Sequence, residues 1–295
     1  MKIKHTLNCC AAFFVAFSLL GVGRVWAVDL PHISQSKIRL SIPPGESRYG
    51  EITVENPSID PRSMKLYMED WYYTIGADGT KEFAPPGTLA TSAVPWISFS
   101  PSEITIPPFG KQKIGYSVKV PADAKGSRYA SLFFENLAGK FGGQAGQVGA
   151  SVDVIIRIAS LFYIEVEGTV TRAAEISNIS VTRQNNNRPL IIEAAFNNTG
   201  SVDLQTASTF DIMDKNGMVV ARGEFNDVYT FPSDKGLLKA RWKEEIPEGI
   251  YDLIITMDLG KAQAEAGFKR GPVITKEARI SIGPDGEVQS LGDLH

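Results

Sequence analysis

The chain has 295 residues, a formal net charge of −3 and 43% hydrophobic residues. This length is sufficient for ordinary apolar cores and favours two domains. A mildly acidic protein is a poor ligand for nucleic acid and for anionic lipid, so the composition excludes both as the main partners.

The N-terminal segment, "MKIKHTLNCCAAFFVAFSLLGVGRVWA", has the pattern of a secretory signal peptide. A basic start precedes an apolar core at residues 11–22, and a small-residue cleavage site ends at Ala27. Because a transmembrane helix needs about 20 apolar residues, we expect residues 1–27 to be cleaved on export, with no stable membrane insertion. Cleavage removes Cys9 and Cys10, the only cysteines, so no disulfide and no thiolate metal site is expected.

Beyond this segment, short stretches of alternating apolar and polar residues are separated by Gly, Pro, Asn and Asp. Residues 111–120 and 251–258 are examples. This period of two is typical of antiparallel strands with one buried and one solvated face. The sequence therefore predicts an all-β protein.

Three consecutive aromatic residues, Trp71, Tyr72 and Tyr73, lie near the end of one such stretch, "MEDWYYTIG". Consecutive residues of a strand face opposite ways, so one or two of these rings must be exposed or meet another domain. Burial of the cluster in the core and the rim of a sandwich is the simpler interpretation.

An unusually long apolar stretch, "GASVDVIIRIASLFYIEVEG", occupies residues 149–168. Its apolar positions Val152, Val154, Ile156 and Ile158 share one face at period two. The strand expected within it, at residues 151–166, has sixteen residues and exceeds the usual strand length of about 5–6 residues. Two interpretations remain open at this point: the strand closes the protein's own core, or it is available to complete another protein.

The two halves of the chain repeat one order of features: strand, Pro, Gly, Tyr, strand. It occurs in residues 118–135 and again in residues 244–258, where Tyr129 and Tyr251 each open a strand after a tight turn. That is the place of the tyrosine corner in an immunoglobulin-like sandwich, in which the phenol bonds back to the backbone of the preceding loop. We therefore expect tyrosine corners in both halves.

This repetition predicts two tandem immunoglobulin-like β-sandwich domains, at residues 28–167 and 168–283. The polar, glycine-rich end, "GPDGEVQSLGDLH", is expected to form a flexible tail at residues 284–295. In "DIMDKNGMVV", the pair Asn216-Gly217 predicts a hairpin turn and not a calcium loop, because the loop has no closing Glu.

The residues needed for catalysis are scarce. The only histidines are His5, His32 and His295, none is paired at metal-ligand spacing, and no Ser lies in a nucleophile elbow. The sequence therefore predicts no enzyme activity, no metal site and no cofactor.

Several segments resemble, in order and spacing, the first domain of periplasmic pilus-assembly chaperones of the chaperone–usher type. They are "PWISFSPSEITIPPFGKQKIGYSVKVP", "GSRYASLFFENL" and the strand that ends in Leu161-Phe162-Tyr163. The similarity covers most of residues 36–166. It implies a chaperone-like or assembly protein of the periplasm and cell envelope, with pilus or surface subunits as its partners.

In that family the last strand of the first domain is lent to a subunit that lacks a strand, a form of β-strand addition. Carried over to this chain, the lent side chains are those of Val152, Val154, Ile156 and Ile158. The glycine-rich segment before them matches the mobile loop that the family has there.

Family members also hold the terminal carboxylate of the subunit with an Arg on the first strand and a Lys on the last. Ser160 stands at the position of that lysine. The resemblance therefore leaves Lys37 or Arg39, together with Arg157, as a possible carboxylate anchor.

Two other functions fit the sequence. One is a structural or adhesive protein of the cell envelope, in which the two sandwiches serve as a spacer or docking surface. The other is a carbohydrate-binding module that uses the aromatic cluster at Trp71.

Overall fold

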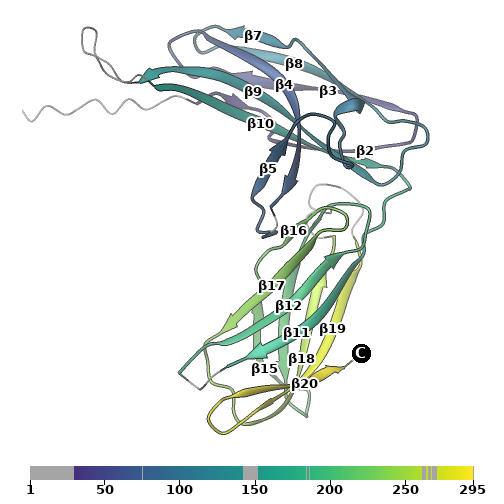
Figure 1. The fold of residues 1–295 in the computed structure, drawn as a ribbon, viewed down its shortest axis with the longest axis vertical. Coiled ribbons are helices and arrows are strands. Elements are labelled where there is room, and N and C mark those ends of the chain that lie inside the picture. The colour runs from purple at the N-terminus through teal and green to yellow at the C-terminus, as the bar shows by residue number, and fades with distance from the viewer. Residues whose placement is uncertain are drawn as a thin grey trace, which may run out of the picture.

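The computed structural model describes residues 30–74, 76–141, 152–183, 185, 187–260, 264, 267 and 271–294. Its regular elements are strands, β1 to β20, with a 3₁₀ turn at Val94–Trp96. They form two β-sandwiches in tandem, so the predicted all-β, two-sandwich immunoglobulin-like fold is confirmed (Figure 1).

The first sandwich has one sheet in the order β1-β3-β8-β6 and another in the order β2-β10-β9-β4-β5, with β7 paired to β4. The strands are β1 His32–Ile33, β2 Lys37–Ile42, β3 Ser47–Glu55, β4 Arg62–Tyr73, β5 Lys81–Ala84, β6 Ile97–Ser100, β7 Glu103–Ile106, β8 Lys111–Lys119, β9 Ser127–Phe141 and β10 Val152–Val166. Every second residue of the strands points into the core between the two sheets. The core includes Ile52 and Ile114 from one sheet and Leu132 and Phe162 from the other. This burial explains the period-two pattern of the sequence.

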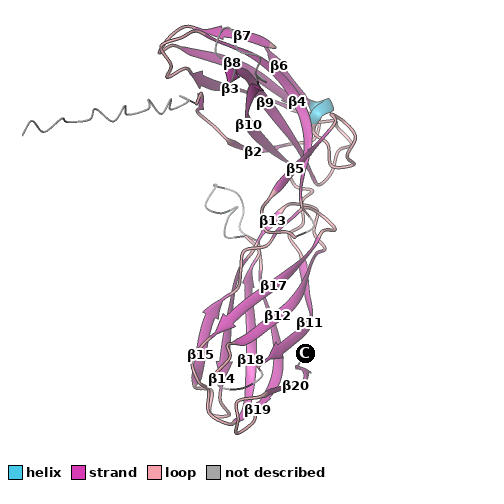
Figure 2. Ribbon diagram, turned by 60° about the vertical axis from the view of Figure 1, so that its left-hand side comes forward, coloured by secondary structure: helices cyan, strands magenta, loops and turns pink. Residues whose placement is uncertain are grey.

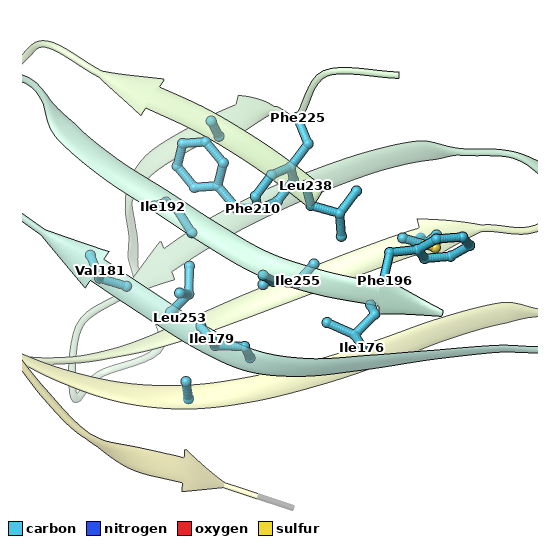
Figure 3. Close-up of a cluster of buried hydrophobic side chains, with 14 of the residues drawn as sticks. Ile176, Ile179, Val181, Ile192, Phe196, Phe210, Phe225, Leu238, Leu253 and Ile255 are labelled. Carbon is cyan, nitrogen blue, oxygen red and sulfur yellow. The ribbon is translucent and has the colours of Figure 1, made fainter. Parts of the chain in front are cut away.

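The second sandwich packs the sheet β11-β12-β17 against the sheet β15-β14-β18-β19-β20, with β13 and β16 paired beside them. Its strands are β11 Ala174–Thr182, β12 Leu190–Asn198, β13 Leu204–Gln205, β14 Ala207–Met213, β15 Val219–Glu224, β16 Tyr229–Thr230, β17 Lys235–Trp242, β18 Gly249–Asp258, β19 Val273–Ile282 and β20 Val288–Leu294. Figure 3 shows its core, to which both sheets contribute, with Ile192 and Phe196 from one and Phe210 and Leu253 from the other.

One of the two predicted tyrosine corners is present. The Tyr251 hydroxyl donates to the carbonyl of Pro247 at 2.9 Å, as a tyrosine corner requires. The prediction for Tyr129 is wrong: its hydroxyl lies 2.6 Å from the Ser127 hydroxyl, and its ring stacks on Phe231 of the second sandwich at 3.8 Å. Tyr129 therefore packs at the contact between the two sandwiches and does not form a tyrosine corner.

The hairpin predicted at Asn216-Gly217 is confirmed. It joins β14 and β15, with Gly217 at φ 79°. The Asp214 carboxylate accepts hydrogen bonds from the backbone N–H groups of Asn216 and Met218. The aspartate thus caps a turn, which accounts for its place in the sequence.

The expected flexible tail at residues 284–295 is corrected by the structure. Residues 288–294 form β20, which pairs with β19 in antiparallel register from Ile282↔Val288 to Glu277↔Leu294. A tight turn between Gly283 and Glu287 reverses the chain, and Val288 packs against the core of the second sandwich. The Gly-Pro-Asp-Gly sequence is thus a turn signal that leads into a strand.

The β4–β5 hairpin extends from the first sandwich to the second (Figures 1 and 2). Ala77, at its tip, belongs to the core cluster of the second sandwich, and its carbonyl accepts a hydrogen bond of 2.8 Å from the Tyr229 N–H. A Cβ on Gly79 would lie 2.9 Å from the Tyr229 ring, so the approach depends on this glycine. The hairpin therefore ties the two sandwiches together.

Candidate functional site

Strand β10 has a neighbour on both sides along only part of its length. It pairs with β9 in antiparallel register from Val152 to Glu165. On its other side it pairs with β2, in parallel register, only from Leu161 to Val166. Within the described part of the chain, residues 152–160 thus have no strand on that side; we call this stretch the free edge.

The register defines which backbone groups point out of the free edge. The Leu161 N–H donates to the Ser36 carbonyl at 2.9 Å, on the side where β2 begins. Strand geometry alternates, so the N–H and C=O groups of residues 155, 157 and 159 point to the same side; the register with β9 shifts between Val154 and Ile155. Such a row of unpaired groups is a template for another strand.

The side chains on the inner face become less covered towards the start of β10. Phe162 and Ile164 are fully buried in the core of the first sandwich, whereas Val154, Ile156 and Ile158 are half-buried. All of them alternate on one face, and Ile158 still packs against that core. The side chain of Val152 lies outside the described residues, as does the glycine-rich loop before it.

The outer face of β10 carries an exposed isoleucine and an ion-paired arginine. Ile155 is 55% exposed there. The Arg157 guanidinium forms an ion pair with Glu69 at 2.7 Å and lies over the Phe133 ring, 4.0 Å from its centroid. Arg157 thus already has a carboxylate partner, on the face opposite to Val154 and Ile156.

The structure does not bring Arg157 together with Lys37 and Arg39. Arg39 is paired in register with Tyr163, six residues further along β10 than Arg157, which corresponds to about 20 Å of strand. Arg157 and Arg39 are thus too far apart along the strands to share one carboxylate, and Lys37, in register with Leu161, is four residues, about 13 Å of strand, from Arg157.

Arg39 lies at the junction between the sandwiches. Its guanidinium bonds both carboxylate oxygens of Asp203 in the second sandwich, at 2.6 and 3.1 Å, and lies 4.0 Å from the Tyr163 ring centroid. Burial acts to lower the pKa of Arg39, but the charge and hydrogen bonds of Asp203 outweigh burial and raise it. The residue is fixed as a structural cation.

Lys37, two residues earlier on β2, has no ion pair among the described residues. Its Nζ lies 4.9 Å from the centroid of the Tyr163 ring. Burial, followed by repulsion from Arg39, lowers the pKa of Lys37 from its ordinary value. A cation held in this way would be stabilised by an incoming anion.

A third cation near this place was not found by the sequence analysis. Lys81, on β5, has its Nζ 5.7 Å from the centroid of the Tyr73 ring, and its charge contributes to the lowered pKa of Lys37. The sequence contains no motif that marks Lys81, because the β4–β5 hairpin brings it to the junction. The Asp203 carboxylate bonds Arg39, and its charge also acts on Lys37.

The aromatic cluster of β4 lies at this junction. Trp71 and Tyr73 pack with Tyr129 and Tyr163 and with Phe231 of the second sandwich. Tyr72 faces the other way, and its hydroxyl bonds Glu82 at 2.6 Å. The expectation that one or two rings meet another domain is thus confirmed. Trp71 is fully buried, so it is not a platform for a sugar.

Two searches of the described residues were negative. No group of three or more His, Cys, Asp or Glu side chains is placed to hold a metal ion. No helix in that part of the chain has the length and apolar character needed to cross a membrane.

No protein-family model matches the chain, and no curated protein matches its sequence. Solved structures that resemble it include the class 5 fimbriae chaperone CfaA, with 14% identity, 84% of this chain and 98% of that chain covered, and a TM-score of 0.49. A chaperone–tip adhesin complex of CFA/I fimbriae has 12% identity, coverages of 84% and 98%, and a TM-score of 0.47.

The chaperone–tip adhesion subunit complex CsuC–CsuE of Acinetobacter baumannii Csu pili has 12% identity, coverages of 83% and 97%, and a TM-score of 0.41. At such identities the likeness concerns the fold alone, and the assignment of the two sandwiches depends on the strand order and cores described above.

Proposed function

We propose that this chain is an exported chaperone-like assembly protein that binds other exported proteins, of the pilus or surface subunit type, by β-strand addition at the free edge. The observation that carries the proposal is that β10 is paired on both sides only from Leu161, although the strand begins at Val152. In this role the protein acts in the periplasm, without a cofactor and without catalysis.

The free edge offers the two components of strand addition. Its backbone groups pair with a client strand, while Val152, Val154, Ile156 and Ile158 provide alternate apolar side chains for a groove of the client. Full burial of such side chains contributes about 1.5–3 kcal/mol each, before the ordering of both partners is subtracted. The half-buried state of the three described side chains leaves apolar surface for a client to cover.

The cations at the junction are suited to the carboxylate at the end of a client chain. In this proposal Lys37 binds the carboxylate, Lys81 adds a second positive charge, and Arg39 remains bonded to Asp203. Lys37 and Lys81 then supply the positive charge that the lysine of the resembling family would supply at the position of Ser160. Arg157 has no part in this anchor.

The proposal is tested by the double substitution Val154→Asp with Ile156→Asp. The chain is co-expressed with a pilus-type subunit from the same organism, and the soluble complex is measured after purification. We expect complex formation to be lost, with the circular dichroism and melting temperature of the free chain retained, because both side chains are only half-buried.

A matched control is Ile250→Asp with Val273→Asp in the second sandwich, where these two side chains are 60% and 55% exposed. The control variant should form the complex as the wild type does. If the first double variant unfolds instead, the strand belongs to the protein's own core, and a structural protein of the envelope becomes the better assignment.

A further inference from the structure

The Lys81 ammonium is held by the tip of the β4–β5 hairpin. Lys81 is the first residue of β5 and stands opposite Tyr73, the last residue of β4. Its Nζ donates a hydrogen bond of 3.0 Å to the carbonyl of Gly79, two residues earlier in the tip. A lysine carries its charge at the end of a flexible stem, so this bond decides where the charge lies. The place of the ammonium therefore follows the place of the tip.

The tip itself is held by the second sandwich (Figures 1 and 2). Ala77 is buried in the core of that sandwich, and a Cβ on Gly236 would lie 3.3 Å from the Ala77 Cβ. Gly79 lies against the ring of Tyr229 with φ 89°, a conformation that favours glycine. The Tyr229 hydroxyl accepts a hydrogen bond of 3.0 Å from Gln205. The ring that the tip contacts is thus fixed from within the second sandwich.

The same part of the second sandwich also binds Arg39. Asp203, the partner of Arg39, directly precedes β13. Strand β13 pairs with β16, which begins at Tyr229. One small pair of strands therefore acts on two cations of the first sandwich: on Arg39 through Asp203, and on Lys81 through the hairpin tip.

Lys81 lies close to Lys37. The Nζ of Lys37 is 4.9 Å from the centroid of the Tyr163 ring, and that of Lys81 is 5.7 Å from the centroid of the Tyr73 ring. The hydroxyls of these two tyrosines are 3.3 Å apart. Both lysines are exposed. A carboxylate bound at Lys37 is therefore also attracted by the charge of Lys81, provided that the tip stays in place.

We propose that the hairpin tip is a positioning element for client binding: the second sandwich holds Gly79 against Tyr229, and Gly79 holds the Lys81 ammonium where the carboxylate of a client binds. The inference rests on the proposed function, because it takes this carboxylate to be that of a client. It adds that the second sandwich, which is not part of the free edge, contributes to the affinity for the client. Gly79 and Tyr229 act through Lys81 and contact no client atom themselves.

Gly79→Ala and Tyr229→Ala disturb the tip from opposite sides. A Cβ at position 79 would lie 2.9 Å from the Tyr229 ring, and loss of the ring removes the surface that the tip contacts. The full exported chain with isotope-labelled lysines is titrated by NMR with N-acetylglycine, a carboxylate that carries one peptide bond. In the wild type the signals of Lys37 and Lys81 should shift. In either variant the affinity should fall about threefold, because one ammonium is displaced.

Two further measurements place the effect at Lys81. Lys81→Ala should weaken the binding of N-acetylglycine as much as Gly79→Ala does, and the two substitutions together should weaken it no further. The uncharged N-acetylglycinamide should leave the lysine signals in place in every chain. An additional loss in the double variant would mean that Gly79 does not act through Lys81.

The matched controls are Gly87→Ala and Tyr49→Ala. Gly87 also has a positive φ, 74°, but no atom lies within 4 Å of the place of its Cβ, so the substitution brings the backbone strain without the collision. Tyr49 is 77% exposed. Both control variants should bind N-acetylglycine as the wild type does.

The pKa of Lys37 distinguishes positioning from a contribution to stability. Burial, Arg39 and Lys81 lower this pKa, and Asp203 raises it. Displacement of Lys81 in Gly79→Ala should therefore raise the pKa of Lys37 towards its ordinary value, as measured from the same signals over a pH series, and Tyr229→Ala should do the same. A tip that only stabilises the fold predicts a lower melting temperature with the pKa and the carboxylate affinity unchanged, and that result would overturn the proposal.

The pilus-type subunit separates this inference from the proposed function. If the wild type and Gly79→Ala form equal amounts of the subunit complex, the positioning role is wrong and the proposed function stands. If the wild type binds no subunit, whereas Gly79→Ala still raises the pKa of Lys37 and weakens the binding of N-acetylglycine, the proposed function is wrong and the tip still positions Lys81 for a carboxylate.

Discussion

At the scale of single residues, the junction between the sandwiches depends on one buried ion pair. The side chains of Arg39 and Asp203 are 7% and 3% exposed. A buried pair is not in itself a large source of stability, because both charges lose their hydration. Removal of one partner is costly, since the other charge then stays buried without compensation.

Asp203→Asn is therefore expected to lower the free energy of unfolding by about 3–5 kcal/mol. The amide keeps the shape of the side chain but not the charge that Arg39 requires. Urea unfolding followed by tryptophan fluorescence measures the loss. The exposed pair of Glu51 and Lys113 is the control, and Glu51→Gln should cost at most about 1 kcal/mol. Equal effects of the two substitutions would contradict the role given to Asp203.

The tyrosines of the junction predict a loss of stability in alkali. Burial raises the pKa of Tyr73, Tyr129 and Tyr163 above the ordinary value near 10. Above pH 10 the unfolded chain releases phenol protons that the folded chain retains, so the free energy of unfolding falls as the pH rises. Below pH 10 this contribution is fully present.

Absorbance at 295 nm during a titration measures the ionised phenols. The three buried tyrosines should ionise only together with unfolding. Tyr73→Phe should make the decline of stability above pH 10 less steep. Ionisation of all tyrosines in a single step near pH 10, without unfolding, would show that the burial is not maintained in solution.

At the scale of elements, β10 is an edge strand in its first part and a central strand in its second part. From Leu161 onwards it is a central strand between β9 and β2, and before that it is an edge strand. The alternation of the sequence is the same in both parts, so periodicity alone cannot distinguish them. Which part is an edge is determined by where β2 begins.

The last strand gives the prediction at this scale. β20 covers the edge of β19 and brings Val288 onto the core of the second sandwich. A chain that ends at Gly283 should lose on the order of 1–2 kcal/mol, because a half-buried valine and a ladder of hydrogen bonds are removed. Thermal unfolding measures the change. Removal of residues 293–295 is the milder control, and an unchanged melting temperature in the longer truncation would restore the expectation of a flexible tail.

At the scale of the whole molecule, the sequence predicts the fold of each sandwich better than it predicts the contacts at the junction between them. Alternation at period two is a local property, and it is sufficient for the two sandwiches, the corner at Tyr251 and the hairpin at Gly217. Tyr129, Lys81 and the partner of Arg39 could not be predicted in this way. Their contacts depend on how one sandwich is placed on the other, and no spacing in the sequence encodes that placement.

The two sandwiches should therefore unfold as one unit as long as the junction is intact. Phe231 is central to it: its ring stacks on Tyr129 at 3.8 Å and contacts Trp71 at a centroid distance of 4.8 Å. Phe231→Ala leaves a cavity between the sandwiches and should cost about 3–5 kcal/mol of coupling between them. Differential scanning calorimetry should then show one transition in the wild type and two in the variant. Phe109→Ala, at a site 68% exposed on the first sandwich, should keep the single transition. Two transitions already in the wild type would mean that the junction does not couple the sandwiches.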